Sequence, residues 1–165
     1  MKDSQSKAKE SSKKPDALQY AYKLLSYRDR SEKELAERLR KKGFQDEAVA
    51  NTIRCLKSKG FINEESLARS LKRIAEEVKL LGDKGVRTLL QQRGISREII
   101  EDIIADNPSD EVVRVKKFVD RKLKTMENYS GEKIKKRIWG ALMRKGYSFE
   151  TIREVFKQLK VKEEE

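Results

Sequence analysis

Basic side chains with helical spacing are the residues of this chain best suited to chemistry, and that chemistry is phosphate binding. Four of them share one face of a predicted helix over residues 131–145: Lys133, Lys136, Arg137 and Arg144. At about 100° per residue they fall within about 100° of one another, opposite Ile134, Ile138 and Leu142. Few acids interrupt this stripe, so it fits contact with phosphates as well as it fits an ordinary solvated face.

A second set of bases crowds the end of another predicted helix, just before Gly43: Arg38, Arg40, Lys41 and Lys42. Cations are favoured at a helix C-terminus by the helix dipole, which is enough to explain them. Contact with an anionic partner is the alternative function for this set.

Other site chemistry finds little support in the chain. There is no histidine, and Cys55 is the only cysteine, so zinc sites and catalytic triads built on these residues are excluded. The pair Gly82 and Gly85 lacks the surrounding pattern of a phosphate loop. We therefore expect no catalytic residue, no metal site and no cofactor, and hence no enzyme.

These bases are positioned by a pattern that occurs three times, around Gly43, Gly94 and Gly146. Each copy has a leucine four residues before the glycine, a base just before it and a large apolar residue just after it. Glycine at such a site ends a helix, because it reaches positive φ without penalty. Self-similarity at a fixed period is typical of stacked repeats.

Apolar residues recur with helical period between the glycines, and strand-like alternation is missing. The sequence predicts an all-α fold of three tandem three-helix repeats, resembling helix-turn-helix units, stacked into an elongated curved rod. The expected divisions are a disordered basic tail (1–16), the repeats and an acidic tail; the repeats cover 17–60, 61–109 and 110–160, and the acidic tail 161–165.

Local signals predict how individual helices begin and which side chains they bury. Ser31 and Glu34 have the spacing of a capping box, in which the glutamate reaches back to the cap. Asn63 is a plausible cap for the first helix of the second repeat. That helix is expected to turn four apolar residues inward: Leu67, Leu71, Ile74 and Val78.

Charge is unevenly spread along the chain. The net charge is +12, with +5 on residues 17–60, −1 on residues 61–109 and +8 on residues 110–160. No apolar run approaches the roughly 20 residues that span a bilayer, and the N-terminus lacks a secretory signal, so we expect a cytoplasmic protein without membrane contact. Basic ends around a near-neutral centre suit a partner that is a polyanion or carries one.

An ordered series of motifs resembles the RecX family over about residues 17–159. The series runs Ser31-x-x-Glu-Leu35-x-x-x-Leu39-x-x-Lys-Gly43-Phe44, Leu56-x-x-x-Gly60-Phe61-Ile62-Asn63, Leu67-Ala68 and Gly82-x-x-x-Val86-x-x-x-Leu90-x-x-x-Gly94-Ile95. The family's turn commonly reads Asp-Asp followed by Phe-Ala where this chain has Asn63-Glu64 and Leu67-Ala68, which are conservative departures at capping and packing positions.

The resemblance implies a modular three-helix fold and a non-catalytic regulator of the RecA recombinase. It implies binding in the groove of the RecA–DNA filament and modulation, with inhibition the leading expectation, of RecA ATPase and strand exchange in DNA repair, recombination and the SOS response. The expected partners are the RecA filament and single-stranded DNA, with double-stranded DNA as a further candidate, and the chain is expected to be a monomer. The two basic sets above are the candidate filament- or DNA-binding residues.

Two other functions remain open at the level of the sequence. One is a DNA-binding protein of helix-turn-helix type that acts without RecA. Against it, the third helix of each repeat lacks the Arg, Asn and Gln clusters that read base edges. The other is a structural adaptor without nucleic-acid contact, whose affinity for RecA would not depend on salt.

Overall fold

The computed structural model describes residues 16–106, 110–126 and 131–163, with side chains described as far as residue 158. The predicted tails lie largely outside these residues. So do Asn107, Pro108 and Ser130, at which the sequence predicts helix boundaries, and the side chain of Leu159, which the sequence predicts to be buried.

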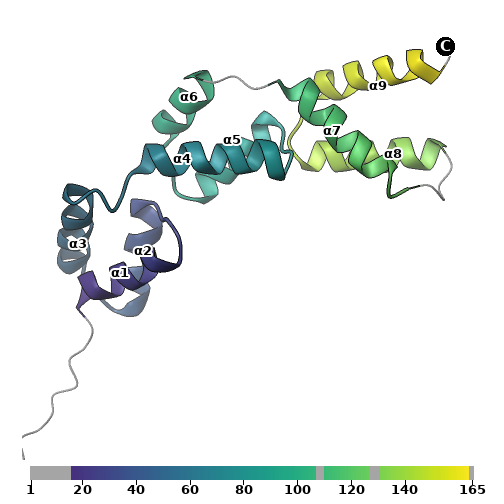
Figure 1. Ribbon diagram of the computed structural model, residues 1–165. Helices are drawn as coiled ribbons and strands as arrows, with labels where there is room; N and C mark the ends of the chain where they lie inside the picture. Colours follow the sequence, from purple (N-terminus) through teal and green to yellow (C-terminus); the bar gives the residue numbers. More distant parts are fainter. Residues whose placement is uncertain (1–15, 107–109, 127–130, 164–165) are drawn as a thin grey trace, which may run out of the picture.

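The described residues form helices and connecting turns, with no strand among them. The helices are α1 (Ala17–Tyr27), α2 (Glu32–Lys42), α3 (Asp46–Ser58), α4 (Glu64–Arg73), the π-helical turn η1 (Ile74–Val78), α5 (Asp83–Gln92), α6 (Arg97–Asp106), α7 (Glu111–Leu123), α8 (Gly131–Arg144) and α9 (Phe149–Glu163). They lie in three groups that follow one another along a bent path (Figure 1). We call α1–α3 the first group, α4–α6 the second group and α7–α9 the third group. The predicted all-α fold of successive three-helix groups is confirmed.

The repeated glycine ends a helix in each group by the same set of hydrogen bonds. Gly43, Gly94 and Gly146 all have positive φ, between 78° and 100°. The residue after each glycine donates its backbone N–H to the carbonyl of the leucine that lies four residues before the glycine. The pairs are Phe44 to Leu39, Ile95 to Leu90 and Tyr147 to Leu142, at 3.1–3.3 Å. This is the Schellman arrangement, which satisfies carbonyls at the helix end and leaves the leucine in the core.

A fourth copy closes α3, where Gly60 has a φ of 73° and Phe61 N–H donates to Leu56 at 2.9 Å. The three-fold pattern in the sequence therefore reports a local rule for ending helices that the chain uses once more than predicted.

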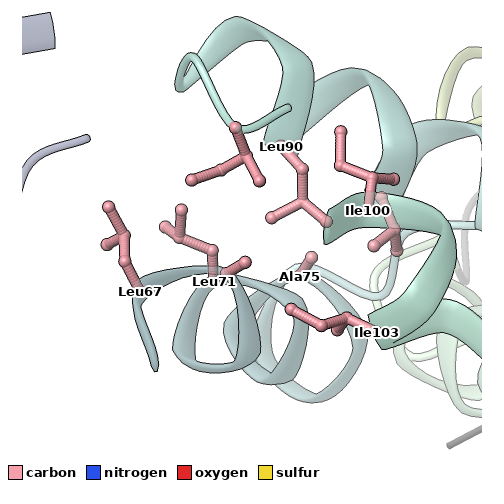
Figure 2. Close-up of a cluster of buried hydrophobic side chains, with 9 residues drawn as sticks. Leu67, Leu71, Ala75, Leu90, Ile100 and Ile103 are labelled. Carbon is pink, nitrogen blue, oxygen red and sulfur yellow. The ribbon is translucent and has the colours of Figure 1, made fainter. Parts of the chain in front are cut away.

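Each group has its own cluster of buried apolar side chains. In the second group, Leu67, Leu71 and Ala75 face Leu90, Ile100 and Ile103 across the interior (Figure 2). The first cluster is built around Leu35, Leu39 and Leu56, and the third around Val115, Leu142 and Ile152. Burying a side chain of this kind contributes about 1.5–3 kcal/mol, so three small clusters supply the main stabilisation.

The predicted inward positions Ile74 and Val78 are wrong. They are 42 % and 67 % exposed, and the chain turns from α-helix to π-helix at residue 74. Lys79 N–H donates to the carbonyl of Ile74 at 3.0 Å, five residues back rather than four. The wider turn rotates the side chains that follow it, including Val78, whereas Ala75, four residues after Leu71, is buried.

The second and third groups meet through their backbones. Gly82 N–H donates to the carbonyl of Lys145 at 3.0 Å, and a Cβ at Gly82 would lie 2.5 Å from the carbonyl carbon of Gly146. Leu80, with φ of 49°, is buried in the cluster of the third group, and its carbonyl accepts from Tyr147 Oη at 2.9 Å. The glycines thus have a second role, close packing between groups, which the sequence did not reveal.

A buried cation adds to this contact. The side chain of Arg114, on α7, is 6 % exposed and pairs with Glu76 at 2.8 Å and with Asp83 at 2.5 Å, both from the second group. Glu76 also accepts from Lys72 at 3.4 Å. Burial makes this network costly to disrupt, because removing one partner leaves a charge uncompensated.

The first and second groups meet through side-chain charges. Glu34, on α2, pairs with Arg93 at the end of α5, with Nε–Oε1 at 2.9 Å, and with Arg28 in its own group, also at 2.9 Å. The backbone N–H of Glu32 donates to Glu64 at 3.0 Å. The predicted capping box is therefore correct only in part: Ser31 Oγ accepts from the N–H of Glu34 at 3.1 Å, but the Glu34 carboxylate binds two arginines instead.

Candidate anion-binding surface

The predicted stripe on α8 is exposed along its length. Lys133, Lys136, Arg137 and Arg144 all point to solvent, while Ile138 and Leu142 on the opposite side are buried. The helical spacing therefore placed the four cations correctly on the outer face of the third group.

The structure adds a concave shape to part of this stripe. A hollow of about 510 Å³ lies between α7 and α8 and is lined by four cations and four uncharged residues: Lys122, Lys136, Arg137 and Arg144, with Met126, Ile138, Gly140 and Ala141. We call it the α7–α8 hollow. No carboxylate lines it among the described residues.

The cations that line the hollow differ from the predicted stripe at one position. Lys133 belongs to the stripe but does not line the hollow, whereas Lys122 lines the hollow but comes from α7. No pattern within one helix could have indicated Lys122, because its place beside α8 depends on how the two helices pack.

Gly140 lines the hollow next to the end of the Arg144 side chain. A Cβ at this position would lie 3.3 Å from Nη1 of Arg144, closer than most such contacts. The guanidinium group of Arg144 therefore lies back over bare helix backbone, one turn before its own Cα. A glycine inside a helix costs about 1 kcal/mol of stability relative to alanine. At this position the missing side chain leaves room for the guanidinium group of Arg144.

The electrostatics of this end of the molecule are one-sided. Lys122, Lys136 and Arg144 form no ion pair with a carboxylate of the described chain, in contrast to Arg114, Arg93 and Arg87 elsewhere. The pKa of Lys145 is lowered, mainly by burial and then by the charges of Lys122 and Lys79. Of these three lysines, Lys122 lines the hollow.

The four predicted bases of the first group are also exposed, but two of them have contacts within the group. Arg40 pairs with Asp46 at 2.7 Å, and the Lys42 ammonium lies 5.7 Å from the centre of the Tyr20 ring. Arg38 and Lys41 point to solvent beside them. The structure does not gather this set into one site, since Arg40 instead borders a separate groove of about 680 Å³ between α2 and α3.

The described part of the chain has neither a candidate metal site nor a candidate membrane span. No group of three or more His, Cys, Asp or Glu side chains there could hold a metal ion. None of its helices is long and apolar enough to cross a membrane.

Comparison with known proteins points to one family. Two family models match, one described as the first three-helix domain of RecX over residues 17–54 and one as the third three-helix domain of RecX over residues 109–156. The regulatory protein RecX of Chlorobaculum tepidum is 30 % identical over 145 residues, covering 88 % of this chain and 89 % of that protein. The regulatory protein RecX of Staphylococcus epidermidis is 34 % identical over 154 residues, covering 90 % of this chain and 54 % of that protein.

The chain thus spans about half the length of several of the curated relatives it matches. Among solved structures, the crystal structure of RecX from Lactobacillus salivarius superposes with a TM-score of 0.73 at 23 % identity, covering 88 % of this chain and 95 % of that one. This structural likeness supports the fold.

Proposed function

The chain belongs to the RecX family, and from that premise we propose that it binds the RecA–DNA filament and modulates RecA without catalysis. The RecX relatives carry the name regulatory protein, and it is the resemblance to this family that implies RecA as the partner. Inhibition of RecA ATPase and strand exchange is the direction we expect.

The observation that carries the proposal is the distribution of charge over an elongated molecule. The net charges of +5 on residues 17–60 and +8 on residues 110–160 flank a segment of −1. The three groups follow one another along a bent path rather than around one core (Figure 1). A long molecule with cationic ends can contact a nucleoprotein filament at two separated places.

The proposed mechanism is occupancy. The first and third groups each hold the filament weakly, and the second group spans between them. Once one end is bound, the other binds with a high effective concentration, so two weak contacts give a strong one. A molecule bound in this way obstructs strand exchange and the subunit motions that accompany ATP hydrolysis.

A RecA ATPase titration on single-stranded DNA at two salt concentrations tests this function. We expect inhibition by the wild-type chain that weakens as salt rises, because phosphate contacts release counterions. A variant with Lys133, Lys136, Arg137 and Arg144 all changed to Gln should need about tenfold more protein for the same inhibition. The matched control changes exposed bases of the second group, Lys84→Gln and Arg97→Gln, and should inhibit like wild type.

Full activity of the four-residue variant would reduce the stripe to ordinary surface. No effect of the wild-type chain on RecA would refute the proposed function itself. Tight, sequence-selective binding to bare duplex DNA would favour the helix-turn-helix alternative, and salt-independent binding to RecA would favour the adaptor.

A further inference from the structure

The cations of this molecule divide into those that hold the fold together and those that do not. Arg93 joins the first two groups through Glu34, and Arg114 joins the last two through Glu76 and Asp83. Arg69 and Arg87 pair with acids inside the second group. Within the described chain, the lysines and Arg144 of the α7–α8 hollow have no such acid partner, although they stand close to one another.

We propose that the α7–α8 hollow is a binding site for a backbone phosphate of a nucleic-acid strand, with Lys122, Lys136, Arg137 and Arg144 as its ligands. The inference rests on the proposed function and assigns the nucleic-acid contact within it to one place. It also replaces the linear stripe by a concave site that takes a residue from α7.

The size and lining of the hollow favour a strand over a free ion. A volume of about 510 Å³ falls in the range of sites that take small organic ligands, roughly 300–1,000 Å³. Met126 and Ala141 offer apolar surface that a sugar can cover, while the four cations can meet the phosphates on either side. Guanidinium groups suit phosphate because two N–H groups can donate to two oxygens at once.

One of the proposed ligands lies against the glycine at position 140. Arg144 lies over Gly140, where a Cβ would approach Nη1 to 3.3 Å. A larger side chain at Gly140 would displace this guanidinium and fill the hollow without changing any charge. Shape and charge can therefore be altered separately.

The decisive experiment compares Lys122→Gln with Lys133→Gln. Both variants remove one exposed or half-buried cation from the third group, but only Lys122 lines the hollow. Binding of the full chain to a fluorescent thymidine oligonucleotide is measured by anisotropy over a range of salt. Lys122→Gln should weaken binding about fivefold and lower the salt slope by about 0.7, the value for one contact to a single strand. Lys133→Gln should bind like wild type.

A second variant tests the shape of the site. Gly140→Leu should weaken oligonucleotide binding by about tenfold or more, since it displaces Arg144 and fills the hollow. Circular dichroism and the thermal midpoint show whether this variant is folded. Because leucine favours helix more than glycine does, we expect the helical signal and the midpoint to match those of wild type.

Competition identifies the ligand. Inorganic phosphate at equal ionic strength should not displace the oligonucleotide, and polyglutamate of equal charge should displace it much less than unlabelled oligonucleotide. Equal displacement by polyglutamate would overturn the assignment in favour of an acidic protein segment. A larger effect of Lys133→Gln than of Lys122→Gln would overturn the assignment to the hollow and favour the linear stripe on α8 as the binding surface.

The RecA ATPase titration separates this inference from the proposed function. If wild type inhibits RecA and Lys122→Gln binds the oligonucleotide normally, the hollow is wrong and the function stands. If wild type has no effect on RecA while Lys122→Gln and Gly140→Leu lose the oligonucleotide, the hollow stands and the function is wrong.

Discussion

The two junctions between helical groups join similar units by different physics. The second and third groups meet backbone to backbone at Gly82 and Gly146, share Leu80 in one core and enclose Arg114. The first and second groups meet through the charged side chains of Glu34 and Arg93 and the carboxylate of Glu64. Close packing and buried charge resist change, whereas partly exposed ion pairs are worth about 0–1 kcal/mol and weaken with salt.

A repeated helical unit therefore does not imply a uniform rod. We expect the second and third groups to move together as one body and the first group to change its angle relative to them. For a protein proposed to lie along a filament, such a joint would let the first group adjust its position while the rest keeps a fixed shape.

The largest expected effect comes from the buried cation at the rigid junction. Arg114→Met should lower the free energy of unfolding by roughly 3 kcal/mol, because Glu76 is then left partly buried without its main partner. Urea denaturation measures the loss. Arg87→Met is the matched control: Arg87 pairs with Glu101 at 2.5 Å but both side chains are well exposed, so it should cost less than about 1 kcal/mol. Equal losses would show that burial at this junction is unimportant.

A steric test of the same junction ranks second. Gly82→Ala should destabilise the chain by about 2 kcal/mol, since the new Cβ meets the backbone of Gly146 and Tyr147 at 2.5 Å. Gly131→Ala is the control, because a Cβ there has no neighbour within 4 Å among the described atoms. Urea denaturation measures both variants. Equal free energies of unfolding for the two would contradict the role of Gly82 in close packing.

Raising the salt concentration, or removing the charge of Glu34, should change the geometry of the junction between the first and second groups more than the stability of the chain. In a Cys55→Ala background, spin labels at Ala50 and Ser70 report the distance between the first and second groups, and labels at Ser70 and Lys117 report the second and third. Raising the salt, or Glu34→Gln, should broaden the first distance distribution and leave the second unchanged. The expected loss of unfolding free energy for Glu34→Gln is below about 1 kcal/mol. Broadening of both distributions would contradict the contrast.

Acid should act on the same junction through Glu34, with the smallest effect. Burial raises the pKa of this carboxyl, but hydrogen bonds from Arg28 and Arg93 outweigh it, so the pKa is lowered from its ordinary value of 4.5. The contribution of Glu34 is therefore complete above about pH 4.5 and is lost as the pH falls through the lower pKa of the folded state. The Ala50–Ser70 distance distribution should broaden only in that acid range, and Glu34→Gln should remove this step.

Local patterns in the sequence were enough to determine that the chain is helical and where the glycine-terminated helices end. The leucine, glycine and apolar residue around Gly43, Gly94 and Gly146 specify a helix end because all their hydrogen bonds lie within six residues. The caps Ser31 and Asn63, and the outward face of α8, follow for the same reason: helical neighbours are three or four residues apart. The functional family was also readable from the order of these motifs.

Tertiary structure alone decided what joins the groups and what forms the candidate site. The passage of Leu80 into another core, the pairing of Glu34 with Arg93 and the entry of Lys122 into the α7–α8 hollow all depend on residues distant in the chain. A periodic pattern shows which face of a helix is apolar, but it does not show which other helix meets that face. Contacts between groups depend on shape and charge at specific distances, and only packing brings those together.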